Sequence, residues 1–142
     1  MRAEPFFPNV TGARLLSVEK KDYTWFFSFT DSVGVTTESP WRLISSDGIV
    51  VTSEDHGHQF GLPNPVDASA RVSSTLKNDP IRTSRIDAST GDLFLSFPGG
   101  TLLQFLQMSF GYEAWHLCVG HNTFICTGGG EIAIFNEKQQ KS

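Results

Sequence analysis

The sequence contains few cysteines, no long apolar run and few cations. Two cysteines in 142 residues are too few for a disulfide-stapled scaffold. No apolar stretch approaches the ~18 residues that a membrane-spanning helix needs. The 11 Lys and Arg are scattered among 15 Asp and Glu, giving a net charge of −4. Because binding to the phosphate backbone of a nucleic acid needs clustered positive charge, we expect no nucleic-acid partner. Because no apolar run is long enough to span a bilayer, we expect no membrane partner either.

The first residues also lack the features of an export signal. Between Met1 and Gly12 there is no basic start, apolar middle or small-residue cleavage site. We therefore expect a cytoplasmic protein. The length matches one ordinary domain, and the 39% apolar content suits a globular core, so we expect residues 1–142 to form a single domain.

Helix-forming residues are scarce, whereas strand-forming residues are abundant. Ala, Glu, Lys and Met total 21, while Val, Ile, Thr and the aromatic residues total 45. Most of the 13 Gly and 7 Pro fall between short apolar runs, as turns between strands require. This composition predicts a mainly β protein.

Eleven short segments have the pattern of strands. Trp25, Phe27 and Phe29 alternate with other residues and therefore share one inward face. Leu93, Leu95 and Phe97 do the same in the second half. The expected strands are 13–20, 25–29, 33–38, 41–44, 49–51, 81–88, 93–97, 101–106, 113–119, 123–127 and 131–135.

One short helix is expected between the two halves. Asn64 suits an N-cap and Pro65 suits the first helical position, so the sequence predicts a helix within residues 64–78. Its shared face would comprise Val66, Ala70, Ser73 and Leu76.

The two halves of the chain resemble each other. Residues 13–29 align without a gap on residues 81–97. The second half has six extra residues around 107–111, and beyond them Trp41 falls on Trp115. The hypothesis is an internal duplication, the alternative being a chance likeness between two meanders of similar length.

The pseudo-repeat halves span about residues 13–52 and 81–135. A meander sheet has one apolar face, which it must cover. We therefore expect two antiparallel meanders, each forming one sheet, that face each other as a sandwich or close as a barrel.

The segment Glu54-Asp55-His56-Gly57-His58 contains four possible metal ligands. Its Gly57 and polar surroundings indicate a loop, and no nearby Cys or His completes a metal site. We expect a solvated loop with no metal and no cofactor, and keep His56 and His58 as candidate ligand-binding residues.

Glu113 and His116 are the other candidate ligand-binding residues. If Trp115 faces the core, His116 faces outward by strand parity. Glu113 has the parity of Trp115, so we expect it at the rim of the core, bonded to the backbone or an Arg. A general base here would need a cleft and a shifted pKa, so no catalytic residue is assigned.

The two thiols and the glycine triplet carry little chemistry. Cys118 and Cys126 flank a turn at His121-Asn122 and lie opposite each other if that turn has three residues. Since a cross-strand disulfide is geometrically demanding, we expect two free thiols. Gly128-Gly129-Gly130 precedes a strand-like segment rather than a helix, so it predicts a hairpin turn and not a phosphate cradle.

Two motifs resemble those of a family of small uncharacterised bacterial proteins. They are G-D-L-F-L-S-F-P-G-G at residues 91–100 and Y-E-A-W at residues 112–115. In that family a G-D-L-x-[apolar]-x-F-x-D-G piece precedes Y-E-x-W, and Gly99 stands where Asp is usual. The resemblance implies a β-rich fold and assigns no catalytic residue. Some such small acidic proteins are thought to sit in toxin–immunity loci.

These patterns favour a non-catalytic bacterial protein-binding module. An acidic protein can mask a basic toxin by steered association, so an immunity-protein-like role is one sharper form of this hypothesis. The alternative is a small-ligand binder or enzyme that uses Glu113 and His116, with His56 and His58. A third hypothesis is a homodimer formed through an exposed apolar edge, so monomer and homodimer both stay open.

Overall fold

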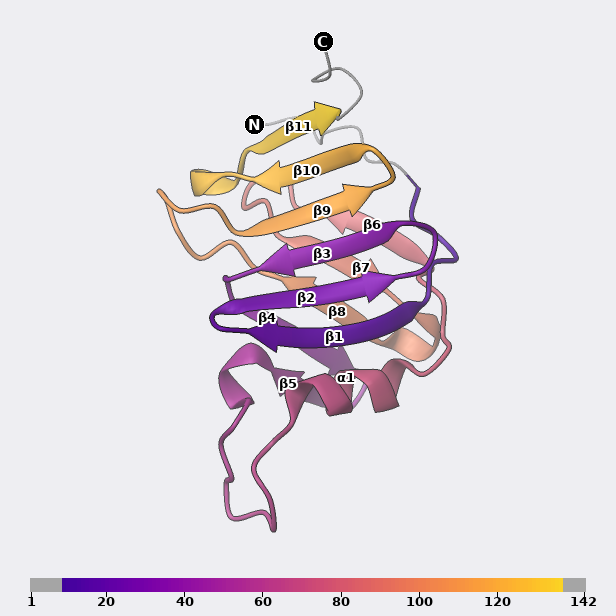
Figure 1. Ribbon diagram of the computed structural model, residues 1–142, viewed down its shortest axis with the longest axis vertical. Coiled ribbons are helices and arrows are strands. Elements are labelled where there is room, and N and C mark those ends of the chain that lie inside the picture. The colour runs from indigo at the N-terminus through magenta and orange to yellow at the C-terminus, as the bar shows by residue number, and fades with distance from the viewer. Residues whose placement is uncertain (1–8, 137–142) are drawn as a thin grey trace.

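The computed structural model describes residues 9–136, which form two antiparallel sheets packed as a sandwich (Figure 1). The first sheet contains β1 (Leu15–Lys21), β2 (Thr24–Phe29), β3 (Val33–Thr37), β9 (Trp115–Val119), β10 (Asn122–Cys126) and β11 (Ile132–Asn136), in that spatial order. The second sheet contains β5 (Gly48–Thr52), β4 (Trp41–Ser45), β8 (Leu102–Phe105), β7 (Leu93–Ser96) and β6 (Thr83–Ile86), in that spatial order. The mainly β prediction is confirmed, and the sheets do not close into a barrel.

Helical structure is limited in the described chain. The one α-helix there is α1 (Ala68–Leu76), and three single 3-10 turns are η1 (Ser53–Asp55), η2 (Pro98–Gly100) and η3 (Gly128–Gly130). Figure 1 shows α1 at one side of the sandwich, where it packs against both β1 and β5.

Aromatic rings between the sheets form the centre of the core. The side chains of Trp25 and Phe27, on the first sheet, are buried as their alternation predicts. Trp41, on the second sheet, meets both rings edge-on, with centroid distances of 5.0 Å and 5.1 Å. Each such pair contributes about 0.5–1.5 kcal/mol beyond its buried area, so these contacts hold the sheets together.

Each half of the chain contributes strands to both sheets. Strands β1 to β3 lie in the first sheet and β4 and β5 in the second, while β6 to β8 lie in the second and β9 and β10 in the first. The expectation that each meander forms its own sheet is therefore wrong. The chain changes sheets at residues 38–40 and again at 106–114. Pro40 lacks the N–H that further pairing would need, which favours the first change.

The two halves nevertheless pair their strands in equivalent ways. Trp25 pairs with Thr37, and the aligned residues Leu93 and Phe105 also pair with each other. The Thr37–Trp115 pair between the halves corresponds in the same alignment to the Phe105–Trp41 pair. A common origin by duplication stays a prediction.

Helix α1 begins later than predicted. The Oδ1 of Asp67, and not Asn64, caps it by accepting a hydrogen bond from the Ala70 N–H at 3.1 Å. Val66 is excluded from the helix because its N–H donates to the His58 carbonyl at 2.7 Å, within the preceding loop. The buried helical residues are Ala68, Val72 and Leu76, whereas Ala70 and Ser73 of the predicted face are exposed.

Two glycines allow the turn before β7 to approach η3 closely. Gly91 has a φ of +79°, and a Cβ on it would lie 2.6 Å from the Gly130 carbonyl oxygen. The Gly91 carbonyl accepts a hydrogen bond of 2.8 Å from the Trp115 indole.

Asp87 lies in the same turn. Hydrogen bonds from the side chain and main chain of Ser89 lower the pKa of the Asp87 carboxyl to about 2.

The substitution Gly91→Ala should destabilise the protein more than Gly99→Ala. Both glycines have φ near 80°, but a Cβ on Gly99 meets no atom within 4 Å. Gly99→Ala should therefore cost only the ~1–2 kcal/mol of left-handed backbone. Gly91→Ala should cost roughly 1–3 kcal/mol more through overpacking. Urea unfolding of both variants measures the difference, and equal midpoints would contradict the close approach.

Candidate functional site

An open cleft of about 760 Å³ lies where the chain crosses between the sheets. One wall is formed by the end of β3 and residues 38–40, and the other by residues 107–114, which lead into β9. The lining residues are Thr24, Thr36, Thr37, Glu38, Ser39, Pro40, Gln107, Met108, Ser109, Gly111, Tyr112, Glu113, Ala114 and His116. The cleft thus lies between crossovers that occupy aligned positions in the two halves.

The second crossover contains the six extra residues and forms a loop, Gln107–Glu113, termed the 107–113 loop. Its large side chains project into solvent: Met108 is 69% exposed, Phe110 95% and Tyr112 80%. Methionine and aromatic residues are enriched in protein interfaces. Three such side chains exposed on one loop beside a cleft make this loop a candidate site.

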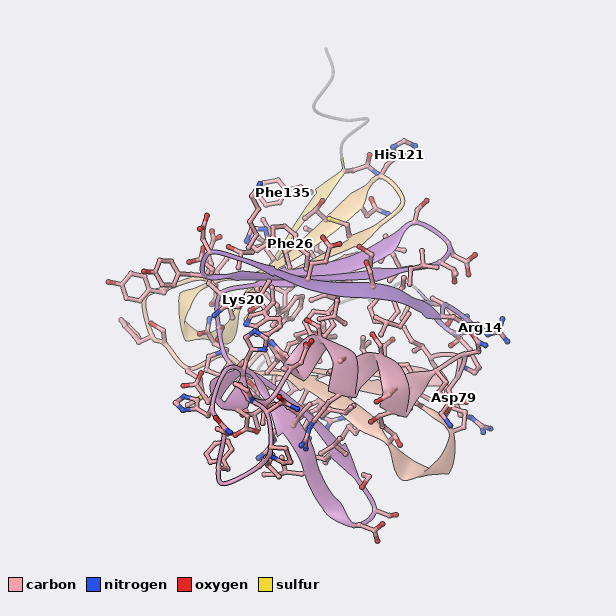
Figure 2. All side chains as sticks on the ribbon, turned by 60° about the horizontal axis from the view of Figure 1, so that its bottom comes forward. Arg14, Lys20, Phe26, Asp79, His121 and Phe135 are labelled. Atoms are coloured by element: carbon pink, nitrogen blue, oxygen red, sulfur yellow. The ribbon has the colours of Figure 1, made fainter. Side chains whose placement is uncertain are left out.

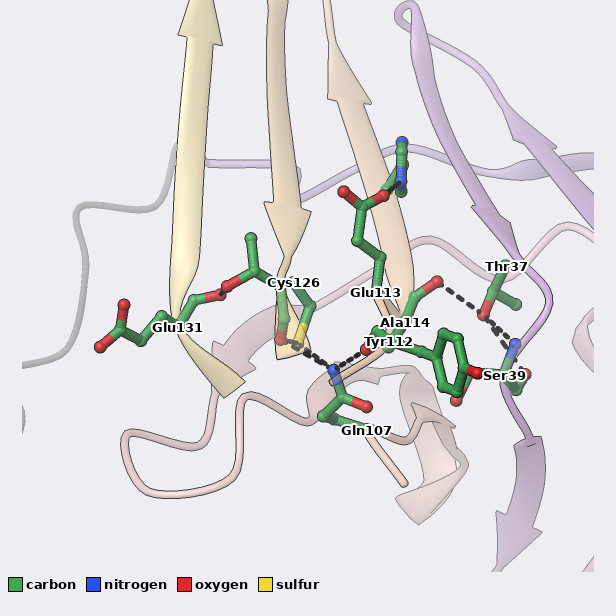
Figure 3. A network of polar contacts seen from close by, with 10 residues as sticks. Thr37, Ser39, Gln107, Tyr112, Glu113, Ala114, Cys126 and Glu131 are labelled. Atoms are coloured by element: carbon green, nitrogen blue, oxygen red, sulfur yellow. Dashed lines mark hydrogen bonds and ion pairs between the residues drawn. The ribbon is translucent and has the colours of Figure 1, made fainter. Parts of the chain in front are cut away.

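Side-chain hydrogen bonds hold the backbone of the 107–113 loop in place. Gln107 donates through Nε2 to the carbonyls of Tyr112 at 3.0 Å and Thr127 at 2.8 Å, as Figure 3 shows. Its Oε1 accepts from the Ser109 N–H at 2.8 Å. The Ser109 hydroxyl accepts from the N–H groups of Gly111 and Tyr112. The loop is therefore ordered although its apolar side chains are exposed.

Hydroxyl groups tie the two crossovers together. The Thr37 hydroxyl accepts from the Ser39 N–H at 2.9 Å and contacts the Ala114 carbonyl at 3.3 Å (Figure 3). The Ser39 hydroxyl donates to the Leu106 carbonyl, and the Leu106 N–H donates to the Pro40 carbonyl. These hydroxyls are engaged in holding the cleft walls and not directed at a ligand.

Glu113 and His116 form the one polar pair that sequence reasoning singled out and the structure brings together. The Glu113 Oε1 lies 2.9 Å from the His116 Nε2, and both side chains are substantially exposed. His116 faces outward as predicted. The placement of Glu113 at the core rim is wrong, because Glu113 precedes β9 and strand parity does not extend to it. Exposed pairs of this kind contribute about 0–1 kcal/mol, so the contact orients the two groups more than it stabilises the fold.

The other two candidate histidines do not line the cleft. The His56 Nδ1 accepts a hydrogen bond from the Ala68 N–H at 3.0 Å, and its ring meets Trp25 edge-on. His58 stacks on Phe60 with a centroid distance of 5.6 Å. His56 therefore supports the start of α1, and His58 belongs to the exposed loop that precedes it.

Neither cysteine forms a disulfide, and the two do not face each other. Cys118 pairs with Thr123, because Gly120 and His121 form a turn of two residues and not three. The condition for Cys118 to lie opposite Cys126, a turn of three residues, is therefore not met. Cys118 is exposed and Cys126 is buried.

Residues 9–136 contain neither a cluster of metal-ligand side chains nor a membrane-spanning helix. No three His, Cys, Asp or Glu side chains gather there as a metal ion would require. No helix in this range is both long and apolar enough to cross a membrane.

Comparisons with protein-family models, curated proteins and solved structures give no match.

Sequence reasoning does not single out Met108, Phe110 and Tyr112 as binding residues. The alignment of the halves places six extra residues at this position, and that length difference is the signal that indicates them. Exposure itself is not readable from the sequence, because the loop lies outside the period-two pattern of the strands.

Removing the Gln107 amide should free the 107–113 loop alone. Gln107→Leu loses the hydrogen bonds to Tyr112 and Thr127, so chymotrypsin should cleave faster after Phe110. Mass spectrometry of the fragments measures the site and rate of cleavage.

Gln59→Leu is the matched control. Gln59 braces the loop before α1 by donating to the Leu62 carbonyl at 2.7 Å, so its loss should accelerate cleavage after Phe60 instead. Unchanged cleavage after Phe110 in Gln107→Leu would show that the loop is held by other contacts.

Proposed function

We propose that the chain is a protein-binding module whose 107–113 loop and adjoining cleft form the binding surface. The observation that carries this proposal is a loop held by Gln107 and Ser109 that exposes Met108, Phe110 and Tyr112. A loop already ordered loses little conformational entropy on binding. Aromatic side chains supply much of the binding energy of typical interfaces.

The charge around the cleft supports a basic partner protein. The lining includes the carboxylates of Glu38 and Glu113 and, among the described residues, no Lys or Arg. The whole chain carries a net charge of −4. A partner with a basic surface would be steered toward this face, and binding should weaken as salt rises. An immunity-protein-like role toward a basic toxin is the sharper form of the proposal.

The equivalent strand pairings support a duplicated origin in which the second half acquired the binding loop. Residues 38–40 connect β3 to β4 directly, whereas residues 106–114 connect β8 to β9 through the 107–113 loop. Added loop residues disturb a packed core little. The binding surface would then be the feature that distinguishes the two halves.

A small-ligand or catalytic site is the second candidate function. It is favoured by the 2.9 Å contact between Glu113 and His116 inside the cleft. It is the weaker candidate because the hydroxyls of Thr37 and Ser39, the cleft residues best suited to assist chemistry, are bonded to the main chain. Ligand binding that Glu113→Gln abolishes, and that serine substitutions at Met108, Phe110 and Tyr112 leave intact, would favour this second candidate.

Replacing the exposed side chains of the loop should abolish partner binding. The wild-type chain and the triple variant Met108→Ser/Phe110→Ser/Tyr112→Ser are immobilised and exposed to an extract of the source cells. Loss of interface anchors worth ~2 kcal/mol or more should lower capture of a specific protein at least roughly 30-fold. Quantitative mass spectrometry measures the captured proteins, and elution with rising salt measures the charge contribution.

The control is the double variant Leu16→Ser/Tyr23→Ser, which removes exposed apolar side chains elsewhere on the surface. It should capture the same protein as the wild type. Equal capture by all three chains would overturn the proposed binding surface.

A further inference from the structure

The two sheets end in four edge strands, and three of these carry features that oppose pairing with another chain. Strand β1 has a bulge between Leu15 and Ser17, and α1 packs against both β1 and β5. Strand β6 is four residues long and contains Arg85. Bulges, short strands, charges and a covering helix are the ordinary means of protecting a sheet edge.

Strand β11 carries none of these features. Its five residues, IAIFN, include no charge and no proline. Its register with β10 is unbroken from the Asn122–Asn136 pair to the Cys126–Ile132 pair. No helix within residues 9–136 packs against it. An uncharged, regular edge strand is a template for pairing with another strand.

The main-chain groups of alternate residues in β11 are directed at this open edge. The Thr127 N–H donates to the Glu131 carbonyl at 2.8 Å, so Glu131 directs its main chain toward the strand that contains β10. Along an antiparallel ladder, hydrogen-bonded pairs alternate with pairs that are not hydrogen-bonded. The N–H and C=O groups of Ile132 and Ile134 therefore point away from β10. No residue in the described part of the chain bonds to them.

The side chains of β11 are also uncovered. Ile134 pairs with Phe124, which is buried between the sheets, yet Ile134 is 50% exposed. The first sheet has one strand more than the second. The inward face of β11 therefore extends past the second sheet, which covers the inward faces of its neighbours. Phe135 is 44% exposed, and Figure 2 shows it projecting outward from the first sheet on the same side as Phe26.

We propose that β11 pairs antiparallel with β11 of a second copy of this chain, joining the two first sheets into one continuous sheet. The edge is self-complementary under a two-fold axis. A register centred on Ile134 places that side chain against its own copy. The same register sets Phe135 opposite Ala133 of the second copy, so a large side chain meets a small one. This inference is independent of the proposed function of the 107–113 loop.

The test is the molar mass of the wild-type chain and of Ile134→Lys, by size-exclusion chromatography with light scattering over a concentration series. The wild type should rise to about twice its 15.7 kDa with concentration. Ile134→Lys should raise the dimer dissociation constant at least roughly tenfold, since like charges would meet across the two-fold axis. Circular dichroism confirms that the variant keeps its β structure.

Ile49→Lys is the matched control, because Ile49 lies on edge strand β5 of the other sheet and is 61% exposed. It should dimerise like the wild type. Amide exchange of Ile132 and Ile134 should slow as the wild-type concentration rises. A monomeric wild type at every concentration, or a dimer that Ile134→Lys leaves unchanged, would overturn the proposal. So would a dimer that only the triple 107–113 loop variant dissociates, which would place the interface at the loop.

Discussion

The edge-to-face contact of Trp41 with Trp25 and Phe27 joins the two sheets and decides where the chain passes between them. Trp41 is fully buried and is the first residue of β4, directly after Pro40. Burying this ring therefore places the first crossover at the end of the sandwich. The Pro40 carbonyl there accepts the Leu106 N–H, which sets the second crossover beside the first. The cleft between them follows from how the core is packed.

The division between core and surface is visible in the 107–113 loop. The ends of this loop are tied to buried structure through Gln107, which reaches the Thr127 carbonyl, and through Ala114, whose N–H donates to Cys126. Between these anchors, the side chains of Met108, Phe110 and Tyr112 are exposed, and these are the contacts proposed for a partner. A rigid scaffold that presents a loop in this way can change its partner by changing loop residues, with little cost to its own stability.

The interleaving of the halves shows where local pattern stops being informative. Alternation along a segment such as Trp25–Phe29 predicts a strand and its inward face, because both depend on neighbours in the chain. Nothing in that alternation states which sheet a strand joins. That choice depends on pairs such as Thr37 with Trp115, which are far apart in sequence.

Local chemistry therefore set the eleven strands and the inward faces of segments such as Trp25–Phe29, since each depends on residues a few positions apart. Long-range contacts decided the remainder. The cap at Asp67 depends on the pairing of Val66 with the preceding loop, and the Glu113–His116 contact depends on where the crossover enters β9. The exposure of Phe110 and Ile134 depends on which neighbours the sheets bring to them. Burial belongs to the folded whole, so it is settled only when distant segments meet.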